Sequence, residues 1–235
     1  NVAFSRIQFT PDLMPSDILG TSVFNVKKSE FEFKKGPIFS SMILIDEINR
    51  APAKTQAALF EVMEEKQVTM DGTTYKMEEP FIVLATQNPI EQEGTYRLPE
   101  AQLDRFLFKI IVDYPTADEE LEIIMREQAL ENTTKASKIE TVIKGSKILE
   151  FRGLVNQIKI EENLLKYIAN IVVNTRSNSF LYLGASPRAS IAILSASKAF
   201  AAIEGRDFVT PEDIKRATIP VLQHRVIVTP EREME

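Results

Sequence analysis

The stretch Met42–Glu47 (MILIDE) is a short, continuous apolar run that ends in two acids. Runs of this kind, rich in Ile and Leu, are typical of strands that helices cover on both faces. A second run, Phe81–Thr86 (FIVLAT), follows the stretch Ala53–Glu65, whose apolar residues recur at helical spacing after Pro52. The order strand, helix, strand predicts an α/β fold built on a parallel sheet.

Two further features are expected on either side of the second strand. The segments Gln67–Thr69 and Thr73–Lys76 flank Asp71-Gly72, the type of pair that closes a two-residue β-hairpin. We expect this hairpin to project between the helix and the second strand. The apolar run Phe106–Val112 predicts another strand of the sheet.

The second half of the chain is predicted to be helical. We place a domain boundary so that an α/β domain covers residues 1–115 and a helical domain covers residues 116–235. The helical part opens with Thr116, which can cap a helix together with Glu119. The polar stretch Glu131–Lys147 predicts a loop or a frayed helix. Helical periodicity marks three further segments, Leu164–Val173, Ser190–Ile203 and Pro211–Ala217.

The composition of the 235 residues limits the chemistry. The absence of cysteine excludes disulfides and thiol nucleophiles, and the single histidine argues against zinc or Ser-His chemistry. A net charge of −6 argues against nucleic acid as the main partner, because phosphate binding requires a basic face. No apolar run is long enough to cross a bilayer, and we expect a cytoplasmic protein. Because Asn1 directly precedes an alternating apolar stretch, we expect the chain to be trimmed from a longer protein.

Polar side chains follow both predicted strands. Asp46 and Glu47 lie at the carboxyl end of the first, the edge at which ligands bind in open α/β folds. The first acid can hold Mg²⁺ and the second can deprotonate a water, although two acids can also simply end a strand. Asn88 follows the second strand and could reach the same water or a phosphate. Its alternative role is that of a turn residue before Pro89.

Two arginines are candidates for binding phosphate. Arg105 precedes the third apolar run, and phosphoryl transfer commonly uses an arginine against transition-state charge. The alternative is a surface arginine paired with a neighbouring acid. Ser186 as a cap and Pro187 as the first helical residue place Arg188 in a first helical turn. A cation there opposes the helix dipole by about 0.3–1 kcal/mol, and a nucleotide phosphate would offset that cost.

Taken together and in order, these motifs resemble the MoxR family of AAA+ ATPases. The resemblance rests on four blocks and covers almost the whole chain. The blocks are RIQFTPDLMPSDILG (6–20), ILIDEINRAPAKTQAALFEVMEEKQVTMDG (43–72), FIVLATQNPIEQEGTYRLPEAQLDRF (81–106) and GASPRA (184–189). The family implies an αβα parallel-sheet core, here incomplete at its N-terminus, followed by a small all-α lid domain.

The resemblance also implies roles for the candidate residues. Asp46 and Glu47 would form the Walker B pair, in which Asp46 holds Mg²⁺ and Glu47 is the base for ATP hydrolysis. Asn88 would be sensor 1. Arg105 would be the arginine finger offered to the neighbouring subunit, and Arg188 would be sensor 2 on the lid.

The chain departs from the family pattern in one respect. Family members carry a phosphate-binding G-x-x-x-x-G-K-[ST] loop, and no such string occurs in these 235 residues. We therefore expect this chain alone to bind ATP poorly and to hydrolyse it negligibly. The resemblance places an insertion at Thr21–Lys35, and the Asp71-Gly72 hairpin resembles the hairpin that precedes sensor 1 in the family. Both are thought to act on partners or on a central pore.

The resemblance predicts an ATP-driven, chaperone-like protein that remodels or matures partner complexes. It implies a ring, which we expect to be a hexamer, and a partner protein for which a von Willebrand factor A-type protein is the candidate. Two alternatives remain open. One is a nucleic-acid motor of a related AAA+ clade, against which the acidic charge counts. The other is a catalytically dead binding module, consistent with the missing loop.

Overall fold

A three-stranded parallel sheet forms the centre of the first half of the chain. The computed structural model describes residues 2–88, 95–129 and 142–233. The sheet has the order β1-β4-β7, with β1 at Phe4–Gln8, β4 at Met42–Asp46 and β7 at Ile82–Ala85. Both strands predicted from their apolar runs are thus confirmed, and they pair in parallel with each other.

The helix between the two strands packs on the sheet. It is α2, Ala53–Glu65, and it has the bounds that its apolar spacing predicts. Leu59 and Phe60 of α2 are buried in one cluster with Ile43 and Ile45 of β4. Alternating residues of the central strand therefore face the helix. Four short helical segments also belong to the described residues of this part: α1 (Pro15–Leu19), η1 (Pro37–Phe39), η2 (Ile48–Arg50) and α3 (Glu100–Leu103).

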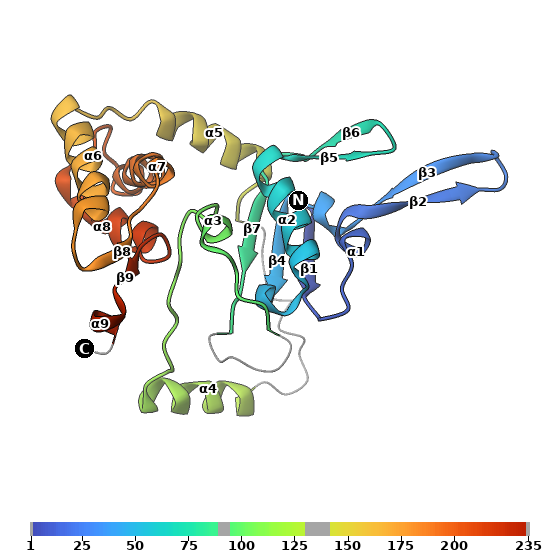
Figure 1. Ribbon diagram of the computed structural model, residues 1–235, viewed down its shortest axis with the longest axis horizontal. Helices are drawn as coiled ribbons and strands as arrows, with labels where there is room; N and C mark the ends of the chain where they lie inside the picture. The colour runs from blue at the N-terminus through green and yellow to red at the C-terminus, as the bar shows by residue number, and fades with distance from the viewer. Residues whose placement is uncertain (1, 89–94, 130–141, 234–235) are drawn as a thin grey trace.

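Two β-hairpins project from the sheet on the same side (Figure 1). One consists of β5 (Gln67–Met70) and β6 (Thr73–Lys76), and it confirms the hairpin predicted around Asp71-Gly72. The other consists of β2 (Gly20–Asn25) and β3 (Glu30–Lys35), where the family resemblance places an insertion. The two hairpins touch each other. Ser22 donates a hydrogen bond to Asp71, and the rings of Phe33 and Tyr75 lie 4.6 Å apart.

The third predicted strand, Phe106–Val112, is wrong. These residues form an irregular link, and Ile110 and Val112 are 76% and 88% exposed. A strand needs a neighbour for its backbone hydrogen bonds, and β7 pairs with β4 alone in the described part of the chain. The link instead passes from the α/β part to the lid. Phe106 packs edge-on against Phe60 of α2, and the Lys109 amide donates to the carbonyl of Pro220 in the lid.

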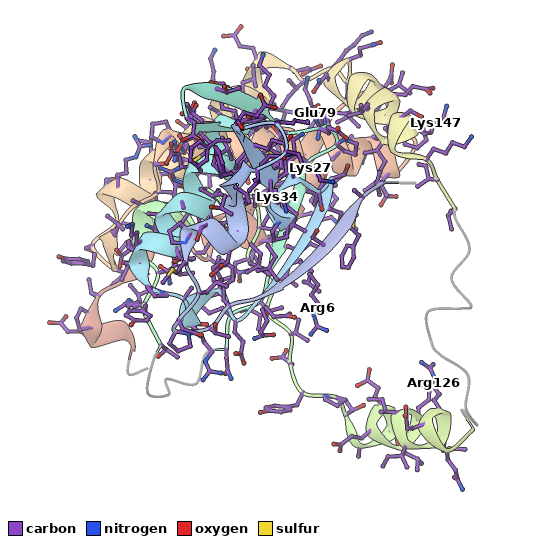
Figure 2. The ribbon with its side chains drawn as sticks, turned by 90° about the vertical axis from the view of Figure 1, so that its right-hand side faces the viewer. Arg6, Lys27, Lys34, Glu79, Arg126 and Lys147 are labelled. Carbon is purple, nitrogen blue, oxygen red and sulfur yellow. The ribbon has the colours of Figure 1, made fainter. Side chains whose placement is uncertain are left out.

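The second half is helical, as predicted. Thr116 and Glu119 form the expected capping box at the start of α4, Ala117–Ala129. Helix α4 stands apart from the other helices, as both Figure 1 and Figure 2 show, with Arg126 labelled on it in Figure 2. The stretch Glu131–Lys147 lies mostly outside the described residues. The remaining helices described in this half are α5 (Gly145–Asn156), α6 (Glu162–Ser177), α7 (Pro187–Ile203), α8 (Pro211–Leu222) and α9 (Pro230–Glu233).

Helices α6, α7 and α8 enclose a second core, in which Ile193 and Ile214 are fully buried. All three helices include the segments predicted from periodicity. Two short strands, β8 (Leu181–Leu183) and β9 (Ile227–Val228), were not predicted, because runs this short carry no periodic signal. Across the described ranges, no helix is both long and apolar enough to traverse a lipid bilayer.

Candidate functional site

The two acids at the end of β4 are held in an unusual backbone geometry. Asp46 is the last residue of the strand, and Glu47 follows with a φ of 54° in the left-handed region. Non-glycine residues adopt this conformation rarely, and such strain often marks functional positions. The Glu47 amide donates to Thr86 Oγ1 at 3.0 Å, and the Ile48 amide donates to the Thr86 carbonyl at 3.0 Å. The end of β7 thus fixes the turn that carries Glu47.

Cationic and amide side chains contact both carboxylates. Arg6 Nε lies 2.6 Å from Asp46 Oδ2. Gln8 Nε2 donates to Glu47 Oε2 at 3.2 Å, and Arg50 Nη1 lies 3.1 Å from the same oxygen. Sequence reasoning gave no role to Arg6 or Gln8, because only the pairing of β1 beside β4 brings them to the acids. Arg6 and Gln8 lie on a strand that pairs with the strand of the acids. A known strand order would therefore have indicated their contacts with the acids.

Asn88 lies at the same edge. The side-chain amide of Asn49 donates to the Asn88 carbonyl at 3.3 Å. Two buried polar atoms here, Asn49 Oδ1 and Arg50 Nε, have no hydrogen-bond partner among the described residues. Buried polar atoms are rarely left unsatisfied, except where a ligand or another group completes the site.

This edge fits a magnesium nucleotide. Mg²⁺ is commonly bound through one or two carboxylates, with water and substrate phosphates completing its shell. Asp46 and Glu47 bring two carboxylates to this edge, and the unpartnered atoms of Asn49 and Arg50 offer further polar contacts. The described residues contain no larger group of acids or histidines that would hold a metal without such a ligand.

The two candidate arginines lie together, on the opposite end of α2. Arg105 and Arg188 each form an ion pair with Glu64, in the last turn of that helix. Arg105 Nη1 also donates to the Phe60 carbonyl at 3.0 Å. Ser186 caps α7 as predicted, since its Oγ accepts from the Arg188 amide at 3.2 Å. These side chains border a cavity of about 340 Å³ between the α/β part and the lid.

The arginine cluster is well separated from the carboxylates. Glu64 lies eleven residues after Ala53, the first residue of α2, which corresponds to about 17 Å along the helix. Glu47 precedes that helix, at its other end. The five residues selected from the sequence therefore form two groups within one chain. Asp46, Glu47 and Asn88 make the first group, and Arg105 and Arg188 make the second.

Hydrogen bonds among Asp104, Ser186 and Arg225, here called the Asp104 joint, hold the second group in place. Asp104 accepts a hydrogen bond from Ser186 Oγ at 2.9 Å and from Arg225 Nε at 2.8 Å. Arg225 also donates to the carbonyls of Asp104 and Phe106, at 2.9 and 2.6 Å. Burial lowers the pKa of Arg225 below its ordinary value, repulsion from Arg188 adds to this, and the Asp104 carboxylate opposes it. The residues that precede Arg105 and Arg188 are thus bonded to each other.

Sequence reasoning missed Glu64, Asp104 and Arg225. Arg225 and Asp104 are 121 residues apart, so no local spacing connects them. Glu64 is one of two consecutive acids near the end of a helix, where acids are common on solvated faces.

Two protein-family models match the chain. Residues 1–108 match the ATPase family associated with various cellular activities (AAA), and residues 173–235 match the AAA lid domain. A parallel sheet with acids at its carboxyl edge, followed by a helical lid, agrees with both matches. The fold, the acidic edge of the sheet and the two family matches together define this chain as an AAA ATPase.

The similar proteins narrow the class. The uncharacterized protein YeaC of Bacillus subtilis is 46% identical over 99% of this chain and 72% of its own length. Chaperone MoxR1 of Mycobacterium tuberculosis is 44% identical over 96% of this chain and 61% of its own. A crystal structure of a candidate ATPase from Cytophaga hutchinsonii shares 47% identity, with a TM-score of 0.89 over 100% of this chain and 73% of that one. The chain belongs to the MoxR family of AAA+ ATPases.

Proposed function

We propose that the complete gene product hydrolyses ATP with Mg²⁺ and uses the energy to remodel or mature partner proteins. The observation that carries this proposal is the strained turn at Glu47, which aims two carboxylates from the edge of a parallel sheet in a MoxR-family chain. AAA ATPase relatives support the reaction class, and the name of the similar chaperone MoxR1 supports the remodelling role.

In this proposal, each residue of the first group has its own task. Asp46 would hold Mg²⁺, which supplies charge stabilisation to the phosphates when bound. Glu47 accepts the proton of the attacking water. Gln8 and Arg50 orient the Glu47 carboxylate, because both contact its Oε2 atom. Asn88 positions the water or the terminal phosphate from the neighbouring strand.

The arginines serve the site of a neighbouring copy. Arg105 and Arg188 lie about 17 Å of helix away from the acids of their own chain, a span that no arginine side chain bridges. An arginine supplied from a neighbour can stabilise the charge that develops on the phosphates. The second arginine extends this role to the lid, since the Asp104 joint holds Arg188 beside Arg105. Catalysis therefore requires a ring, which we propose to be a hexamer.

The substrate of the ring is proposed to be a protein. A von Willebrand factor A-type protein is the candidate partner, on the basis of the family resemblance. The joined hairpins β2–β3 and β5–β6 project from the α/β part (Figure 1), and we propose that they contact partners or the ring pore. We also propose that residues 1–115 form the sheet domain and residues 116–235 form the lid, and that these two domains move relative to each other.

The variant Glu47→Gln tests the proposed chemistry. It keeps the size and the hydrogen-bonding capacity of the side chain but removes the base, so we expect ATP turnover by the complete gene product to fall about 100-fold or more. Nucleotide affinity, measured by equilibrium titration, should stay within a few-fold of the parent. Glu65→Gln, on the solvent face of α2, is the matched control and should keep full turnover. Unchanged turnover in Glu47→Gln would refute the assignment.

A further inference from the structure

Glu64 bridges the two candidate arginines with its two carboxylate oxygens. Arg105 Nη1 contacts Oε2, and Arg188 Nη2 contacts Oε1. Arg105 comes from the end of the α/β part and Arg188 from the lid, so one acid of α2 pairs with a cation from each. A carboxylate held between two guanidinium groups occupies the place in which an oxyanion would bind.

The cavity around this bridge keeps an excess of positive charge. Its lining includes three arginines, Arg105, Arg188 and Arg225, and two acids, Glu64 and Asp104. Asp104 is already engaged by Arg225 and Ser186. Of these two acids, Glu64 is the one that pairs with both candidate arginines. In a chain with a net charge of −6, such a local excess favours an anionic ligand over a neutral one.

The two arginines are anchored in different ways. Arg105 Nη1 also donates to the Phe60 carbonyl, which holds its guanidinium group independently of Glu64. The Ser186 cap fixes the backbone of Arg188, because Ser186 Oγ accepts from the Arg188 amide and donates to Asp104. The removal of Glu64 should therefore leave Arg105 in place and release the guanidinium group of Arg188 to bind another anion.

The bridge is open to exchange with a soluble anion. The side chain of Glu64 is 36% exposed and that of Arg188 is 47% exposed. Ion pairs with this exposure contribute little to stability. A phosphate carries more negative charge than a carboxylate and can accept bidentate hydrogen bonds from an arginine, so it can replace Glu64.

We propose that Arg105 and Arg188 form a phosphate-binding site. In a subunit that has no neighbour, Glu64 occupies this site as an internal counter-ion. A nucleotide phosphate presented by a neighbouring copy displaces it. The inference rests on the proposed function for the identity of that ligand, but the binding of a phosphate chain in place of Glu64 can be tested without ATP turnover.

The test is calorimetric titration of the 235-residue chain with inorganic tripolyphosphate at low ionic strength. In Glu64→Gln the internal competitor is removed, and we expect the affinity to rise about fivefold or more. Glu65→Gln removes the same charge one residue further along α2 and is the matched control, with an affinity within about twofold of the parent. Adding Arg188→Ala to Glu64→Gln should abolish the gain.

An unchanged affinity in Glu64→Gln would overturn the inference, as would an equal gain in Glu65→Gln or a gain that persists without Arg188. The failure of the proposed function gives a different result. If Glu64→Gln binds tripolyphosphate more tightly while the complete gene product shows no ATP turnover, the counter-ion exists but the enzyme assignment fails. If the complete gene product hydrolyses ATP but Glu64→Gln binds tripolyphosphate no more tightly, the enzyme assignment stands and the counter-ion inference fails.

Discussion

Arg225 shows how much of the arrangement depends on a single buried charge. Its side chain is 3% exposed, and it joins Asp104 to the carbonyls of the link that leads out of the sheet domain. A buried ion pair adds little net stability, but the removal of one partner leaves the other charge without compensation. These hydrogen bonds therefore connect the lid to the end of the sheet domain, and in this structure Arg188 lies beside Arg105.

We predict that Arg225→Leu lowers the free energy of unfolding by about 3–5 kcal/mol, because Asp104 is left charged and partly buried. Denaturant unfolding followed by circular dichroism measures this loss. Arg216→Leu is the control, since Arg216 pairs with Glu204 on the surface and should cost about 1 kcal/mol or less. Equal losses in the two variants would contradict the role given to the joint.

Several residues of the site were predictable one by one, and their grouping was not. Asp46, Glu47 and Asn88 each follow an apolar run, and the rule that ligands bind at the carboxyl ends of parallel strands places them at one edge. The pairing of Gln8 with Glu47 depends on the order of the strands. The convergence of Arg105 and Arg188 on Glu64 depends on how the lid docks, which local sequence does not encode.

At the scale of elements, helix α8 shows how local sequence determines a boundary. Its capping box joins Thr210 to Asp213, whose carboxylate also accepts two hydrogen bonds from Arg206, at 2.7 and 2.8 Å. The Arg206 contact is the main reason that the pKa of Asp213 lies below its ordinary value of 3.8, with the Thr210 hydrogen bonds adding to the effect and burial opposing it. The ionised carboxylate of Asp213 thus stabilises the start of helix α8.

The lowered pKa predicts the direction of a pH effect. The contribution of Asp213 to stability is complete above pH 3.8 and is lost as the pH falls through its lowered folded-state pKa. Asp213→Asn should lower stability at neutral pH by about 1–3 kcal/mol and should weaken the decline in stability below pH 3.8. Thermal unfolding of both proteins from neutral pH to about pH 2 measures this, and parallel pH profiles would contradict it.

The run Phe106–Val112 marks the limit of prediction at this scale. Its composition favours a strand, but a strand requires a partner, and in the described residues the free edge of β7 has none. Helix α2 and the β5–β6 hairpin were predicted correctly, because their spacing and turn residues act locally. The difference lies in whether an element depends on a distant neighbour for its hydrogen bonds.

At the scale of the whole molecule, we propose that each chain contributes to two ATP sites. It provides the acids of its own site and the arginines of a neighbour's site. The acids lie at one end of α2 and the arginines at the other, and we therefore propose that a complete site requires two copies. If this holds, a subunit that lacks its base can still serve its neighbour, and a subunit that lacks its arginine can still use its own base.

The most direct measurement mixes two variants of the complete gene product, Glu47→Gln and Arg105→Ala, and records ATP turnover. Each variant alone should be nearly inactive, because the base contributes about 10²–10⁴-fold and a neighbour's arginine about 10³–10⁵-fold. In the mixture, Arg105 of a Glu47→Gln subunit can complete the site of an Arg105→Ala neighbour. We predict that mixing restores a substantial part of the parent turnover and that the rate per subunit rises with protein concentration. A mixture as inactive as its components would contradict catalysis between neighbouring copies.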